Sequence, residues 1–169
     1  DSIDSSLLLH FWNSYELSSE VVVDALEILP ITSELSSRLA NTNDFIKKIA
    51  QETSIDEQFH CLQMRSRGLN KLDWSAKQIS QLDYRVQYEL FKLIGENIST
   101  DIWLKASLMN ISLSHIGAIF LPTDLFIERI NLITSLEDQY YFVQLRVSSS
   151  YKLDWSAKQI SQLDYRVQY

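Results

Sequence analysis

The sequence predicts an all-α protein built from a repeated unit, and three observations lead to that prediction. Only three Gly and two Pro occur among the 169 residues, so few positions can stop a helix or form the tight turns that join strands. Apolar residues recur three and four positions apart in segments that open with Ser, Thr, Asn or Asp, which is the pattern of amphipathic helices. Residues 71–88, KLDWSAKQISQLDYRVQY, return without one change as residues 152–169.

The identical copies lie 81 positions apart, and the same offset aligns much of the remaining chain. Residues that match their partners at this offset are Thr42, Phe45, Ile46, Ile49, Thr53, Ser54, Gln58, Gln63 and Arg65. We therefore predict two helical units, residues 1–81 and residues 82–169, the second with a C-terminal tail at 152–169. The identical tails indicate either a recent natural duplication or an engineered appendage over residues 148–169. The absence of Met at the first position suggests a fragment.

Candidate helix caps divide each unit into about six short helices. Side chains of Ser, Thr, Asp and Asn accept hydrogen bonds from the free backbone N–H groups of a first helical turn. In the first unit the candidate caps are Ser5, Ser6, Ser18 or Ser19, Thr32 with Ser33, Asn43 or Asp44, Ser54, and Asp73 or Ser75. In the second they are Ser99, Ser112 or Ser114, Thr123 or Asp124, and Ser135. The repeated stretch forms one long helix or two that join near residues 82–83.

The apolar spacing also predicts which side chains are buried. The expected core residues of the first unit are Ile46, Ile49, Phe59, Leu62, Leu69, Leu72, Ala76, Ile79, Leu82 and Val86. Cys61 falls at an apolar helix position, so we expect a buried structural thiol rather than a nucleophile. The four Trp residues are expected in the core or at interfaces.

Composition excludes several classes of partner. The net charge of -7 disfavours nucleic acid, because phosphate binding needs clustered Lys and Arg. No run of 18 apolar residues is present, so no membrane span is expected, and no signal peptide is visible. A single cysteine cannot form an internal disulfide and is typical of a reducing compartment. We expect a cytoplasmic protein.

The residue types needed for catalysis are not arranged in any recognisable motif. His10, His60 and His115 are isolated, and none lies at metal-ligand spacing from another His, Cys or Asp. The three glycines are too sparse for a phosphate-binding loop. We therefore expect no catalytic, cofactor or metal site, and a protein that is not an enzyme.

Four short motifs resemble one known family. They are the Ser-Ser-Glu-Val type sequence at 18–21 and 99–102, the Phe-Ile pair after Asp44 and Leu125, the Lys-Leu-Asp-Trp sequence at 71–74 and 152–155, and Asp-Tyr-Arg-Val at 83–86. Together they resemble the tandem death effector domains of initiator-caspase prodomains and FLICE-inhibitory proteins, in the death-fold superfamily. The chain has Lys where the family has Arg in the third motif, and Lys lacks the fork of donors that Arg offers a carboxylate.

The resemblance implies two tandem six-helix antiparallel bundles joined by a helix, acting as a non-enzymatic homotypic interaction module. Such a module is an adaptor or regulator of death-receptor type signalling assembly, and its partners are proteins with like helical domains, including further copies of itself. The partner-binding residues that the resemblance implies are Glu20, Leu26, Lys71, Asp73, Asp101, Lys152 and Asp154. Each charge could instead be a solvated surface residue or a helix cap. The alternative function is a helical-repeat structural scaffold, whose units stack as a solenoid.

Overall fold

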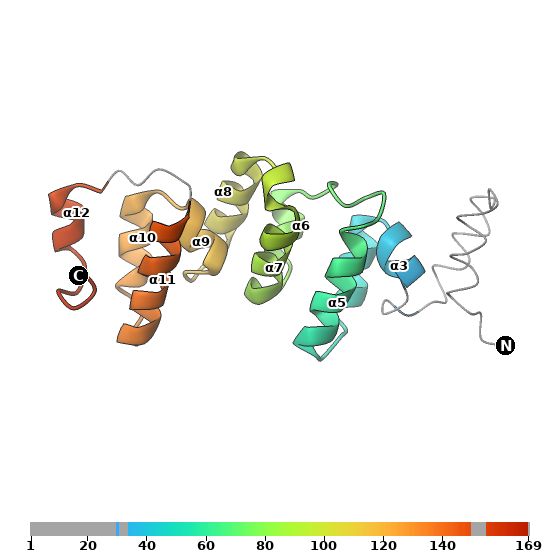
Figure 1. Cartoon of the computed structure of the whole chain (residues 1–169), viewed down its shortest axis with the longest axis horizontal. Coiled ribbons are helices and arrows are strands. Elements are labelled where there is room, and N and C mark those ends of the chain that lie inside the picture. Colours follow the sequence, from blue (N-terminus) through green and yellow to red (C-terminus); the bar gives the residue numbers. More distant parts are fainter. Residues whose placement is uncertain (1–29, 31–33, 150–154, 169) are drawn as a thin grey trace. The chain divides into compact units, whose positions relative to one another are not determined.

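The computed structural model describes residue 30, residues 34–149 and residues 155–168. In this part of the chain every regular element is a helix, which confirms the all-α class (Figure 1). Among the same residues, no helix is both long enough and apolar enough to cross a membrane. The predicted helices that open near residues 5 and 18 lie outside the described residues.

The chain divides into two compact units, Asp1–Ile98 (unit 1) and Ser99–Tyr169 (unit 2). This division falls later than the predicted boundary after residue 81, because helix α7 (Tyr84–Ile94) packs within unit 1. By sequence, α7 opens the second repeat. Its buried residues Val86, Gln87, Leu90 and Ile94 form one face, and that face packs against the helices that precede it.

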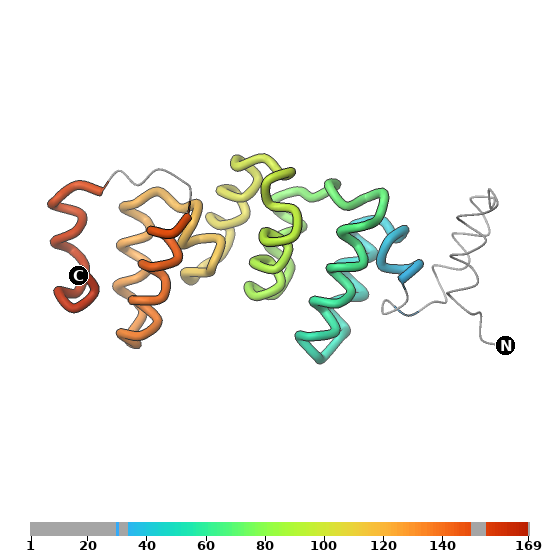
Figure 2. The backbone as a smooth tube through the Cα atoms, in the orientation of Figure 1, coloured from blue at the N-terminus to red at the C-terminus, as the bar shows by residue number. Residues whose placement is uncertain are grey.

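Unit 1 contains α3 (Glu34–Leu39), α4 (Thr42–Ile49), α5 (Ile55–Arg65), α6 (Ala76–Ser80), α7 and the 3₁₀ turn η1 (Gly95–Asn97). Figure 2 traces this backbone. Helix α5 contacts both α3 and α7, whereas α6 contacts α4 and α7. The buried side chains include the predicted Ile46, Ile49, Cys61 and Leu62.

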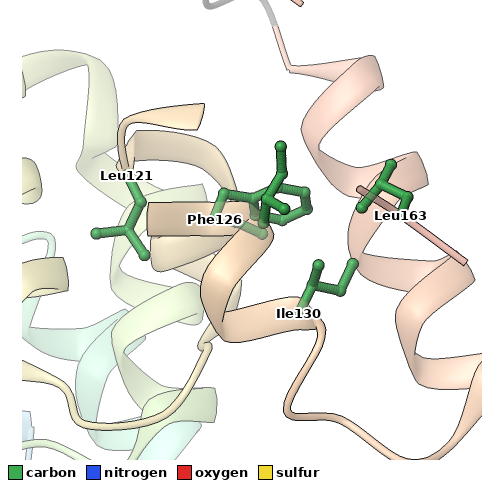
Figure 3. Close-up of a cluster of buried hydrophobic side chains, with 6 residues drawn as sticks. Leu121, Phe126, Ile130 and Leu163 are labelled. Carbon is green, nitrogen blue, oxygen red and sulfur yellow. The ribbon is translucent and has the colours of Figure 1, made fainter. Parts of the chain in front are cut away.

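Unit 2 contains α8 (Thr100–Met109), α9 (His115–Phe120), α10 (Thr123–Ile130), α11 (Leu136–Ser148) and α12 (Ala157–Ser161). Helix α9 contacts α8 and α11, and α10 contacts α12. Leu163, which follows α12, points toward Phe126 and Ile130 of α10 in a shared apolar cluster (Figure 3). This cluster joins the C-terminal segment to the rest of the unit.

The helices of the two units repeat in register. Helices α9, α10 and α12 begin and end 81 positions after α3, α4 and α6, and α11 begins 81 positions after α5. The offset found in the sequence is therefore also the offset of the described helices.

Five of the predicted helix caps are confirmed. The side chains of Ser54, Ser75, Ser99, Ser114 and Ser135 each accept a hydrogen bond from a backbone N–H of the helix that follows. The repeated stretch in unit 1 forms two helices rather than one. Asp83 is the cap of the second, since its carboxylate accepts from the backbone N–H of Arg85 at 2.9 Å.

Two predicted caps are wrong. Helix α4 is capped by Asn41, not by Asn43 or Asp44, because Asn41 Oδ1 accepts from the backbone N–H of Asp44 at 2.9 Å. Helix α10 begins after Pro122 with no side-chain cap, so neither Thr123 nor Asp124 has that role. Proline fits this position, because a helix start leaves its backbone nitrogens without partners in any case.

Two predicted core residues are exposed, and two others, Phe59 and Ala76, are half-buried. Leu69 is 78% exposed and Leu72 is 47% exposed. Both lie in the non-helical connection between α5 and α6, where helical spacing does not determine which way a side chain points. Leu82 and Val86, farther along the same stretch, are buried as predicted.

Candidate protein-interaction site

A buried arginine joins three elements of unit 1. Arg65, the last residue of α5, is 1% exposed. Its Nη1 donates to the carbonyl oxygens of Ser37 at 3.2 Å and Ala40 at 2.7 Å, and its Nη2 donates to Thr42 Oγ1 at 2.7 Å. The two carbonyls belong to the C-terminal end of α3, where backbone acceptors lack helical partners and a cation is favoured. Arg65 therefore fixes the turn between α3 and α4 against α5.

Two aromatic rings enclose the guanidinium. The Arg65 Cζ atom lies 4.7 Å from the Phe45 ring centroid and 5.7 Å from that of Trp74. The two rings meet edge to face, with centroids 6.1 Å apart at 89°. Burial lowers the pKa of Arg65 to about 10, and the nearby charge of Asp73 opposes that shift. The group is therefore a cation at neutral pH, held by neutral acceptors and aromatic faces.

Unit 2 contains the same arrangement 81 residues later. Arg146 Nη1 donates to the Ala118 carbonyl at 2.8 Å, and Nη2 donates to Thr123 Oγ1 at 3.1 Å. Its Cζ lies 4.6 Å from the Phe126 centroid and 5.9 Å from that of Trp155. Burial lowers the pKa of Arg146 to about 10 as well. We call these two clusters the arginine nodes. Each consists of one Arg, one Thr, one Phe, one Trp and the backbone carbonyls to which the Arg side chain donates.

Identity at the 81-residue offset is the sequence signal for the nodes. Thr42, Phe45 and Arg65 were among the residues that are identical at the 81-residue offset. Charged residues are rarely buried, so identity alone did not indicate that this arginine belongs to the core.

The predicted charged residues lie at the surface where they are described. Lys71 and Asp73 are exposed, and no ion pair joins them within the described ranges. The backbone carbonyl of Asp73 accepts from Thr42 Oγ1 at 2.8 Å, which attaches this loop to the node. Asp101 is exposed and pairs with Lys105 at 2.7 Å. Glu20, Leu26, Lys152 and Asp154 lie outside the described residues.

The described residues include no metal-binding cluster, and their one cysteine is buried. No group of three or more His, Cys, Asp or Glu among them could hold a metal ion. Cys61 is buried, as predicted, and burial raises the pKa of its thiol. A thiol in that state is a weak nucleophile at neutral pH, because thiolate is the reactive form.

Unit 2 has an apolar groove of about 260 Å³, which is lined by Val143, Val147, Trp155, Ile160, Leu163, Val167 and Gln168. We call it the α11–α12 groove. Trp155 contributes both to this groove and to the arginine node, so the groove wall is held by the node. Sequence reasoning missed the groove, because its lining comes from two segments whose packing a helical pattern does not specify.

No family model, curated protein or solved structure matches the chain. Its function is therefore inferred from the two nodes, the groove and the surface charges.

Proposed function

We propose that this protein is a non-enzymatic scaffold of tandem helical repeats that binds other proteins. The observation that carries the proposal is the recurrence of one arginine node at the same offset in two separate compact units, with the same Arg, Thr, Phe and Trp and with the bond to Ala118 in the place of the bond to Ser37. In repeat proteins each module buries its apolar face against the next module. Helix α7 supports this organisation, because it begins the second sequence repeat yet packs within unit 1.

The surface of unit 2 supports protein rather than nucleic acid as the partner. Tyr140 and Tyr141 of α11 are both exposed, and tyrosine is enriched in protein interfaces. The α11–α12 groove is lined almost entirely by apolar side chains. The net charge of -7 opposes contact with phosphate backbones.

A second candidate function is homotypic assembly of the death-fold type, with two six-helix bundles that serve as a cytoplasmic adaptor. The exposure of Lys71, Asp73 and Asp101 favours it, because these are the charges that the resemblance assigns to the contacts. Such contacts join one face to a different face of the next molecule, so they do not close and can grow into filaments.

Light scattering coupled to size-exclusion chromatography of the full chain, over a hundredfold concentration range, separates the two functions. The scaffold predicts one monomer mass at every concentration. Homotypic assembly predicts a mass that rises with concentration and falls again in Asp101→Lys, but not in the control Glu128→Lys, another exposed acid of unit 2. A rising mass with that pattern of variants would overturn the scaffold proposal.

A further inference from the structure

An exposed face of α11 combines two acids with two tyrosines. Tyr140 and Tyr141 are each 45% exposed. Glu137 and Asp138 lie one helical turn before them and Gln144 lies one turn after, so these side chains are neighbours on the helix surface. All five are exposed, and we call them the α11 face; the helix is labelled in Figure 1.

The α11 face has no positive charge of its own. Arg146, which is the only Lys or Arg in α11, is buried in its node. Within the described ranges, no ion pair involves Glu137 or Asp138. Acids in a first turn also stabilise a helix through its dipole, so the acids alone do not indicate a binding site. The exposed tyrosines beside them do, because tyrosine is enriched among the residues that contribute most to protein binding.

Helix α5 of unit 1 provides a comparison in which the acids occur without the tyrosines. Asp56 and Glu57 lie 81 positions before the two acids of the α11 face, and both are exposed. At the positions of the tyrosines, α5 has Phe59, which is half-buried, and His60. Of these two helices, only α11 presents tyrosine rings beside its acids.

We propose that the α11 face binds an arginine-rich segment of a partner protein. This inference rests on the proposed scaffold function and specifies the partner of one surface. Arginine suits both components of the face, because its guanidinium forms forked hydrogen bonds with carboxylates and stacks on aromatic rings. The net charge of -7 favours a cationic partner further, since charge complementarity speeds association.

A second copy of this chain is a poorer occupant than such a partner. Arg65 and Arg146 are buried, and Arg38, Arg85 and Arg166 pair with acids of their own chain. These arginines would have to leave their present partners to reach the α11 face of another molecule. An arginine-rich segment of a different protein has no such requirement.

The test is an NMR titration of the ¹⁵N-labelled full chain with the synthetic peptide Gly-Arg-Arg-Gly-Arg-Arg-Gly. Two control peptides have Lys or Gln in place of every Arg. We expect saturable shifts of the backbone amides of residues 137–144, weaker binding of the Lys peptide and none of the Gln peptide. The amides of residues 56–63 in α5 are the internal control and should shift less. No saturable shift, or equal shifts in α5 and α11, would overturn the inference.

Variants of the chain separate the two components of the face. Tyr140→Ser should weaken binding of the Arg peptide about two- to fivefold, which is the effect of one exposed cation–π contact. Tyr140 is chosen because Tyr141 also packs edge to face on His115, with ring centroids 5.6 Å apart. Glu137→Gln should weaken binding as well and reduce its dependence on salt.

The matched control is Glu128→Gln, which removes the same charge from an exposed residue of α10. It should change the affinity less than Glu137→Gln does. Equal weakening by these two variants, with none from Tyr140→Ser, would mean that the peptide is attracted to the net charge of the chain and would overturn the assigned site.

The mass series described above distinguishes failure of this inference from failure of the proposed function. A constant monomer mass without peptide binding overturns the α11 inference alone. A mass that rises with concentration and becomes monomeric in Tyr140→Ser identifies a second copy as the occupant, which overturns the partner segment. A rising mass that responds to Asp101→Lys, together with saturable shifts at residues 137–144, overturns the scaffold and leaves the α11 face in place.

Discussion

Residues 74–87 and 155–168 have the same fourteen letters, and the structure places them in two different environments. Their local structure is the same. Ser75 and Gln78 form a reciprocal capping box at 2.8 and 3.2 Å, and Ser156 and Gln159 form its equivalent at 2.9 and 3.1 Å. Burial differs at part of the segment: Ile79 is 0% exposed and Ile160 is 38% exposed, whereas the leucine and valine that follow are buried in both copies. Short-range hydrogen bonds are therefore determined by the segment itself, whereas burial depends on what packs against it.

The comparison extends to secondary structure at the end of the segment. The residues Tyr-Arg-Val-Gln begin helix α7 in unit 1 but form turns in unit 2. Helix formation has a costly nucleus, and its gain comes from the residues that propagate it. In unit 1 those residues follow and bury Leu90 and Ile94. The same four residues are thus helical in unit 1 and form turns in unit 2.

The largest expected effect comes from removing an arginine node. Arg65→Ala removes the Arg65 donor from three buried acceptors, of which the Ala40 carbonyl keeps a long bond from Asn70, and a buried acceptor left unpaired costs about 1–3 kcal/mol. We expect the free energy of unfolding to fall by about 3–5 kcal/mol, measured by urea denaturation followed by circular dichroism. Arg146→Ala should cost less, because Arg146 has fewer hydrogen-bonded acceptors within the described residues.

The control for the node is Arg67→Ala, which removes an exposed arginine close to Arg65 in sequence. It should change the free energy of unfolding by less than about 0.5 kcal/mol. Equal losses from Arg65→Ala and Arg67→Ala would show that the node does not stabilise unit 1.

The next effect compares one substitution in the two copies. Ile79→Ala removes a fully buried side chain and should lower the free energy of unfolding by about 2–4 kcal/mol. Ile160→Ala makes the same change in an identical helix at a residue that is 38% exposed, and should cost less than about 1 kcal/mol. Urea denaturation measures both. Equal losses would mean that the groove is closed in solution and would remove the contrast between the units.

The sequence predicted the helices well, because caps and apolar spacing act over a few residues. Ser54, Ser99 and Ser135 could be identified as caps without an alternative, whereas Ser75 was one of two candidates with Asp73. Asn41 was missed because several cap-forming residues lie within the same four positions, and local preference does not choose among them. Leu72 was predicted to be buried because the helical spacing of apolar residues was extended over a segment that is a loop.

The candidate site was beyond sequence reasoning for a different reason. The α11–α12 groove is lined by Ile160 and Trp155, which are more exposed than their counterparts Ile79 and Trp74 in unit 1. The difference in exposure depends on packing between segments. It cannot be read from the sequence, because the two copies are identical. The arginine nodes likewise depend on carbonyls and rings brought together from separate helices.

A smaller effect should be equal in the two copies. Ser75→Ala and Ser156→Ala each remove the side-chain acceptor of a capping box, and loss of such a cap costs about 1 kcal/mol. Because capping is local, we expect the same loss of unfolding free energy in both, measured by urea denaturation. The control is Ser112→Ala, at an exposed serine in the connection that precedes α9. A large difference between Ser75→Ala and Ser156→Ala would show that packing controls even the caps.

The smallest effect concerns the aspartate–arginine pairs that both copies contain. Arg166 donates to both carboxylate oxygens of Asp164, from Nε at 3.0 Å and from Nη2 at 2.7 Å. This hydrogen bonding lowers the pKa of Asp164 to about 2, and Arg85 lowers the pKa of Asp83 in the same way. Because an unfolded Asp has a pKa near ~3.9, the pair stabilises the folded state above about pH 4, and that contribution is lost as the pH falls through about 2.

An NMR titration of the carboxyl carbons checks this prediction. The Asp164 midpoint should lie near pH 2 in the full chain and return toward about 4 in Arg166→Gln. Lys158→Gln, which changes an exposed cation of α12 that is not paired with Asp164, should leave the midpoint unchanged. Since the Asp83 pair has the same residues, its midpoint should also lie below the usual value and respond to Arg85→Gln. A normal midpoint at Asp164 together with a lowered one at Asp83 would mean that this pair, unlike the capping boxes, needs the helix that follows it in unit 1.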